Sequence, residues 1–171
     1  RLEGLPDLRK RQWSTLFSLC LKESKNKPMR FRRLTAKELE AVEKEFVKFL
    51  SSQGIDSTEW QRIKSDDAEK IDFFLDEFST LFWESSTEKI TYLERKSDED
   101  RWVFKFSESS ARVIRWVQKE GDEKPELFSG LKEFPQEARS REVFLLLEQG
   151  LQPCPEEKHE ELEKLFTQED L

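Results

Sequence analysis

KITYLERKSDEDRWVFKFSESSARVIRWVQ, residues 89–118, is the stretch that decides the fold class of this chain. It contains three segments that alternate apolar and polar positions and are rich in β-branched and aromatic residues: Lys89–Arg95, Arg101–Ser107 and Arg112–Gln118. Short polar links of hairpin length join these segments, Ser97–Asp100 and Glu108–Ser110. The stretch therefore predicts a three-stranded antiparallel meander.

The aromatic residues of this meander fall on defined faces. Trp102, Phe104 and Phe106 share one face of their strand, and Ile114 and Trp116 share one face of the next. We expect helices to cover the aromatic face, so that these rings are core residues. The alternative is a base-stacking surface like that of an RNA-recognition module, but the glycines and the βαββαβ order of that module are absent.

Helical patterns precede the meander. Thr35 and Glu38 predict a capping box, with Leu34 and Leu39 as a hydrophobic staple, and the helix that starts there should end at Gly54. A short helix is expected from Asp56-Ser57 through Ile63. The next helix should be central to the fold and follows the cap Ser65–Asp67, with an apolar stripe of Ile71, Phe74, Leu75, Phe78, Leu81 and Phe82. Phe73 and Trp83 lie off that stripe, so we expect this helix to be covered on more than one side.

After the meander, the chain returns to helix. Residues 121–136 predict a loop held down by apolar side chains, residues 138–149 a helix ended by Gly150, and a last helix follows Pro155. The predicted fold class is α+β, with three N-terminal helices, a three-stranded antiparallel β-meander and two C-terminal helices.

Charge divides the 171 residues unevenly at Met29, the single methionine. Residues 1–28 carry a net charge of +4 and residues 29–171 a net charge of −11. We predict that residues 1–28 are a leader, namely a tag, a mis-started extension or a flexible amphipathic segment. The amphipathic reading rests on apolar residues at helical spacing, Trp13, Leu16, Phe17, Cys20 and Leu21. Residues 29–171 are predicted to form a single α+β domain.

Several kinds of functional site lack their residues. Two cysteines and one histidine are too few for a zinc cluster, and five scattered glycines form no phosphate-binding loop. Asp72, Asp76 and Glu77 share a helix face that we interpret as solvated, and His159 is predicted to lie on an exposed helix. No apolar run could span a bilayer and no secretory cleavage site follows the basic start. The sequence predicts a cytoplasmic protein without metal or cofactor and favours a non-enzymatic role.

Short motifs in a fixed order resemble a known family. They are Met29–Thr35 (MRFRRLT), Glu45–Leu50 (EFVKFL), Gly54-Ile55, Glu59-Trp60, Tyr92–Glu94 and Phe144–Gly150 (FLLLEQG). With these motifs, residues 29 to about 166 resemble an uncharacterised family of small cytoplasmic proteins from Bacteroidota. The resemblance implies a natural start at Met29 and carries no catalytic residue.

Two functions from different classes remain open, beside a third, an unrecognised hydrolase, which would need a concave pocket that gathers Asp, Glu or His. The surplus of Trp and Phe predicts an interaction or accessory protein that binds another protein. The alternative is binding of RNA or single-stranded nucleic acid through a basic arm, with further contacts on the second strand: Arg30, Phe31, Arg32, Arg33, Arg101 and Lys105. Because the chain is rich in acidic groups, pairing of the arm's arginines with carboxylates is favoured over contact with phosphates. The sequence leaves the partner and the oligomeric state undetermined.

Overall fold

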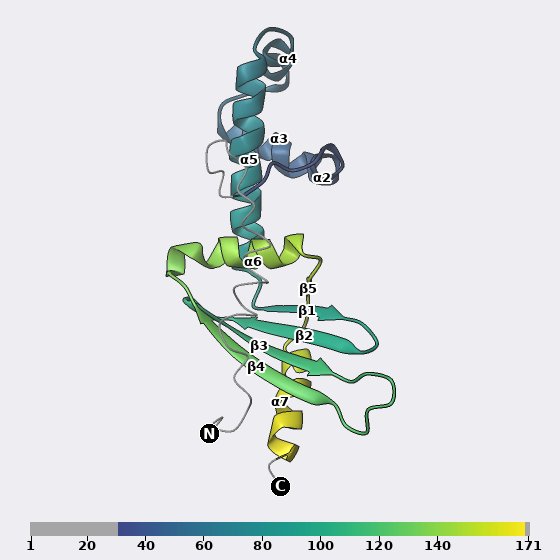
Figure 1. Ribbon diagram of the computed structural model, residues 1–171. Coiled ribbons are helices and arrows are strands. Elements are labelled where there is room, and N and C mark those ends of the chain that lie inside the picture. The colour runs from purple at the N-terminus through teal and green to yellow at the C-terminus, as the bar shows by residue number, and fades with distance from the viewer. Residues whose placement is uncertain (1–30, 170–171) are drawn as a thin grey trace. The chain divides into compact units, whose positions relative to one another are not determined.

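A computed structural model describes residues 31–169 of the chain, with side chains through Leu165. The chain divides into two compact units, one ending at Ser86 and one starting at Thr87 (Figure 1). We call the described residues 31–86 the helical unit and residues 87–169 the sheet unit. The predicted leader, residues 1–28, lies outside the described residues, and the single domain over 29–171 stays a prediction.

The helical unit contains α2 (Ala36–Ala41), α3 (Glu43–Ser52), α4 (Ser57–Asp66) and α5 (Ala68–Glu88), whose last two residues belong to the sheet unit. The predicted first helix is therefore two helices. The interruption falls at Val42, whose backbone leaves the helical region at φ −116° and ψ 28°. A β-branched residue has low helix propensity, and the apolar period alone does not reveal such a break.

Local signals fix the ends of these helices as the sequence predicted. The Thr35 hydroxyl accepts a hydrogen bond from the Glu38 N–H, and the Glu38 carboxylate accepts one from the Thr35 N–H at 2.8 Å, which completes the capping box. Asp56 caps α4 through the Glu59 N–H at 2.8 Å. At the end of α3, Gly54 has a φ of +76°, a left-handed conformation that closes helices at low cost for glycine.

The core of the helical unit is aromatic. Leu50 of α3, Ile63 of α4 and Phe74 of α5 are buried, and partly buried rings surround them. Phe46 and Trp60 meet edge to face at a centroid distance of 5.6 Å. Because edge-to-face ring pairs add to the free energy of burial, a few large side chains stabilise this small unit.

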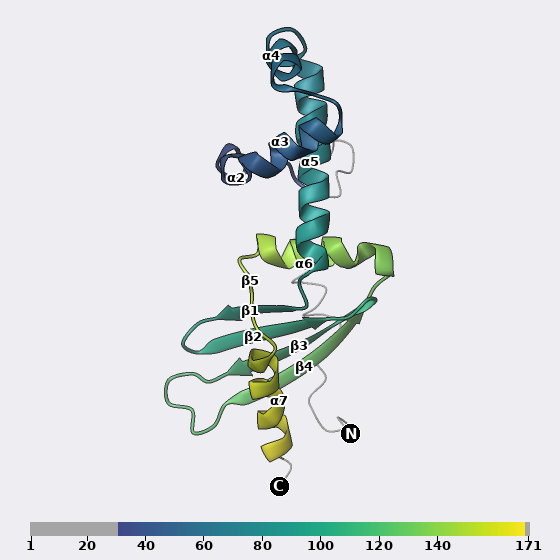
Figure 2. The same ribbon diagram turned by 180° about the vertical axis from the view of Figure 1, so that it is seen from behind.

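The sheet unit is built on a five-stranded antiparallel sheet in the order β4-β3-β2-β1-β5 (Figure 2). The strands are β1 (Tyr92–Lys96), β2 (Asp100–Phe106), β3 (Ser110–Val117), β4 (Glu126–Glu133) and β5 (Gln152–Pro153). Strands β1 to β3 form the predicted meander, but the expectation of three strands was wrong. β4 lies within the predicted loop at 121–136, where Gly130 weakens the strand pattern and pairing with β3 stabilises it.

Helices cover both faces of this sheet. On one face, α6 (Arg139–Glu148), which follows the 3-10 turn Gln136–Ala138, packs Val143 and Leu146 against the aromatic rings of β2. Trp102, Phe104 and Phe106 are all buried there, as predicted. On the opposite face, α7 (Glu157–Glu169) packs Leu162 against Val103 and Ile114. The two C-terminal helices are thus confirmed, and each has its own face of the sheet.

Candidate interaction surface

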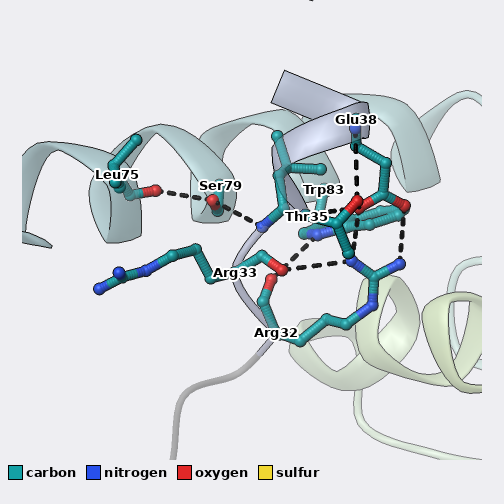
Figure 3. Close-up of polar contacts among 8 residues, drawn as sticks. Arg32, Arg33, Thr35, Glu38, Leu75, Ser79 and Trp83 are labelled. Carbon is teal, nitrogen blue, oxygen red and sulfur yellow. Dashed lines mark hydrogen bonds and ion pairs between the residues drawn. The ribbon is translucent and has the colours of Figure 1, made fainter. Parts of the chain in front are cut away.

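The arm that precedes α2 is packed along α5 (Figure 3). Phe31 and Leu34 are buried, and the Leu34 N–H donates a hydrogen bond to the Ser79 hydroxyl at 3.0 Å. The Trp83 indole N–H donates to the carbonyl oxygen of Arg32 at 3.1 Å. Backbone bonds at two points, one turn apart on α5, hold the arm in one register.

The guanidinium group of Arg32 lies between a carboxylate and an aromatic ring. It donates to both carboxylate oxygens of Glu38, at 2.7 and 2.8 Å, and its central carbon lies 5.0 Å from the centre of the Trp83 ring. The bond from Arg32 lowers the pKa of Glu38 to about 2, helped by the Thr35 N–H. Two-point pairing of this kind is the geometry in which an arginine holds a carboxylate best.

Arg33 pairs with two acidic residues of α5. Its Nε donates to Asp76 at 2.6 Å and one terminal nitrogen donates to Asp72 at 2.8 Å. The bonds to Asp76 and Asp72 raise the pKa of Arg33. The pairing that the acidic composition favoured is therefore present for Arg32 and Arg33, while Arg30 lies outside the described residues.

The remaining two candidate residues lie on β2, on the face of the sheet that α7 covers. Arg101 is half-buried and forms ion pairs with Glu94 at 3.5 Å and Glu161 at 3.3 Å. Lys105 is exposed, with its ammonium nitrogen 5.7 Å from the centre of the Tyr92 ring. The structure thus brings Phe31, Arg32 and Arg33 together in the helical unit and places Arg101 and Lys105 together in the sheet unit.

His159 is buried, and the prediction of an exposed histidine was wrong. Its ring lies 5.8 Å from the Tyr92 ring, and Nδ1 is 3.6 Å from a carboxylate oxygen of Glu163. Three residues further along α7, Leu162 faces the same side, so the two point together toward the sheet. Burial lowers the pKa of His159, opposed by Glu163, and the charges of Lys105 and Arg112 lower it further. Because charged residues flank His159 in the sequence, the three-residue spacing that places it on the same face of α7 as Leu162 is not apparent from the sequence alone.

One line of α5 faces solvent. Phe73 and Leu81 are 57% and 50% exposed, and Glu77, midway between them, is exposed as well. Residues four apart lie almost above one another on a helix, so these three form a continuous stripe, which we call the α5 stripe. The expectation that Phe73 would be covered was wrong, and Leu81, predicted on the same apolar stripe as Phe74 and Phe78, is exposed as well. Phe74 and Phe78 fill the interior instead and leave Phe73 on the outer side.

Metal-ligating groups and the free Cys154 were considered as further candidate sites. Within residues 31–169, no group of three or more His, Cys, Asp and Glu side chains could hold a metal ion. Burial and the charge of Glu94 raise the pKa of the Cys154 thiol to about 11, which disfavours the reactive thiolate. In that same part of the chain, no helix is long and apolar enough to cross a membrane.

Comparison with known proteins gives one result. Neither the curated proteins nor the solved structures contain a match. The chain does match a family of unknown function, DUF6495, over residues 29–120, which include the whole helical unit and strands β1 to β3. The match confirms the resemblance to an uncharacterised family over residues 29–120. The extension to about residue 166, with its Phe144–Gly150 motif, and the Bacteroidota origin stay predictions. Because the matched residues make up more than half of the chain, the protein belongs to the DUF6495 family.

Proposed function

We propose that this protein is a protein-interaction domain and that the α5 stripe is its contact surface. The observation that supports the proposal is the exposure of Phe73 and Leu81, each at least half open to solvent on one line of a helix. Exposed apolar side chains are common singly, and here two of them lie two turns apart on one line of a helix, where they offer a partner two anchor points. Large side chains of this kind act as anchors when a partner excludes water from them.

The neighbourhood of the stripe makes it a rigid platform. On the inner side of α5, Phe74 and Phe78 are buried, and the side next to them carries the arm through Ser79 and Asp76. A helix held in this way presents its outer residues without further ordering. A partner therefore loses little free energy to conformational entropy of this surface when it binds.

Differential capture tests the proposal. The full chain, the double variant Phe73→Gln/Leu81→Gln and the control Leu131→Gln are each used to capture proteins from cells that make this protein. Leu131 is a matched control because it is 59% exposed but lies on β4. We expect a protein that is retained by the wild type and by the control and lost with the double variant. Equal capture by all three would contradict the proposal.

Nucleic-acid binding is the alternative, through Arg30, Phe31, Arg32, Arg33, Arg101 and Lys105. The exposed Lys105 beside the Tyr92 ring supports it, since cations next to aromatic rings suit single strands. Against it, Arg32, Arg33 and Arg101 would have to exchange carboxylate partners for phosphates. Binding of a mixed single-stranded pool that weakens steeply with salt, and that is lost in Arg32→Gln/Arg33→Gln, would favour this alternative.

A further inference from the structure

We infer that the α5 stripe binds an amphipathic helix of another protein that carries basic side chains beside its apolar face. The inference rests on the proposed function and adds to it the chemistry of the partner.

The charge of α5 is strongly acidic. Up to Ser86, the helix carries five acidic side chains and one lysine. Asp72 and Asp76 already hold Arg33. Glu77, in the middle of the α5 stripe, forms no ion pair with any of the described residues. A partner that desolvates Phe73 and Leu81 must also cover Glu77, so it needs a cation there to avoid burying an unpaired charge.

The spacing of the stripe suits a helix. At a rise of 1.5 Å per residue, Phe73 and Leu81 lie about 12 Å apart along the axis, with Glu77 halfway. A partner helix laid along α5 presents its own side chains at the same intervals, three to four residues apart. Two apolar residues of the partner can therefore meet Phe73 and Leu81 while a lysine or arginine between them reaches Glu77.

Other occupants fit less well. In a symmetric dimer through this stripe, each copy would present the same patch to the other, and the two Glu77 carboxylates would approach one another. A nucleic acid or an anionic membrane would meet the acidic helix with like charge. Compared with these occupants, a basic helix has the charge that complements both the stripe and its surroundings.

The test measures binding of two synthetic peptides to the full chain. One is an 18-residue amphipathic helix of leucine and lysine, and the other has the same pattern with glutamate in place of lysine. We expect the lysine peptide to bind, the affinity to fall as salt rises, and the glutamate peptide not to bind. Phe73→Gln and Leu81→Gln should each weaken the binding of the lysine peptide about tenfold or more.

Charge variants make the readout specific to the stripe. Glu77→Lys should weaken the binding of the lysine peptide as much as Phe73→Gln or Leu81→Gln does. It should also allow the glutamate peptide to bind. The matched control Glu45→Lys makes the same charge change at an exposed position of α3 and should leave the affinity of both peptides nearly unchanged.

Three outcomes would overturn the inference: no binding of the lysine peptide, equal loss of binding in Glu45→Lys and Glu77→Lys, or self-association that Phe73→Gln abolishes. If any of these occurs while differential capture still depends on Phe73 and Leu81, the partner chemistry is wrong and the proposed function stands. If capture is also unaffected, both are wrong.

Discussion

Glu38 joins the basic arm to the first helix. Its carboxylate accepts hydrogen bonds from both terminal nitrogens of Arg32 and from the Thr35 N–H. One side chain thus completes a helix cap and neutralises the cation that lies over Trp83. The charged contacts that join the arm to α5 itself are those of Arg33 with Asp72 and Asp76.

Replacing Glu38 should therefore lower stability in two separable ways. Glu38→Ala removes the cap and the ion pair, and we expect a loss of about 1–2 kcal/mol in the free energy of unfolding, measured by urea denaturation. Glu38→Gln keeps the capping hydrogen bonds and should cost less. Equal effects of Glu38→Ala and of Glu40→Ala, an exposed control in α2, would contradict this account.

The same residue predicts a pH dependence. The pKa of Glu38 falls from an ordinary value of 4.5 to about 2 because of Arg32 and the Thr35 N–H. A depressed carboxyl pKa stabilises the folded state above the unfolded value, and this stabilisation is lost as the pH falls from about 4.5 to about 2. In Glu38→Gln, the acid-induced loss of stability should be smaller over this window. If the stability of the wild type and that of Glu38→Gln fall in parallel over this pH window, this prediction is contradicted.

His159 predicts a pH dependence of its own. Burial lowers its pKa from the ordinary 6.5, with Glu163 and Glu156 opposing and Lys105 and Arg112 assisting. Because the unfolded chain then binds the proton more readily, stability should fall as the pH drops below 6.5. The loss is up to about 1.4 kcal/mol at pH 5.5. His159→Leu should flatten this part of the curve, measured by denaturation between pH 7.5 and 5.5. An unchanged slope in the variant would show that His159 is not responsible.

Gly54 ends α3 in a conformation that other residues adopt at a cost. An added Cβ would meet no atom within 4 Å, so the cost of substitution is that of the backbone at φ +76° alone. We expect Gly54→Ala to lower the free energy of unfolding by about 1 kcal/mol and Gly54→Asn by less, measured by urea denaturation. Asparagine tolerates this conformation better, so the opposite order would contradict a left-handed cap.

Elements that depend on neighbouring residues could be predicted from the sequence. Thr35 with Glu38, Asp56 and Gly54 mark helix ends by bonds within a few positions, and all three were correct. Strands β1 to β3 alternate strongly and are joined by short links, so their order followed as well.

Elements that depend on distant partners could not be predicted. β4 contains Gly130 and two glutamates at its ends, and β5 has only two residues. Both form because β3 and β1 offer unpaired edges, which no local pattern reveals. The exposure of Phe73 has the same origin, since an apolar residue on a helix is buried only where another element covers it. Arg33 was identified as a candidate from the sequence, but its carboxylate partners on α5 lie about forty positions away.

Each of the two units has its own hydrophobic core, and the two cores share no residue. Phe104→Ala should lower the stability of the sheet unit by about 3–5 kcal/mol because it removes a buried ring. Hydrogen exchange should then speed up in β1 to β4 and stay unchanged in α4. Phe74→Ala should give the reverse pattern. Equal acceleration in both units by either variant would show that their cores unfold as one.

We propose that this member of the DUF6495 family binds another protein through the α5 stripe. The most direct measurement is hydrogen exchange of the full chain with and without the protein that differential capture identifies. We predict slower exchange in residues 70–84 of α5 on binding, and no such change for the Phe73→Gln/Leu81→Gln variant. Protection that appears elsewhere and leaves residues 70–84 unchanged would contradict the claim.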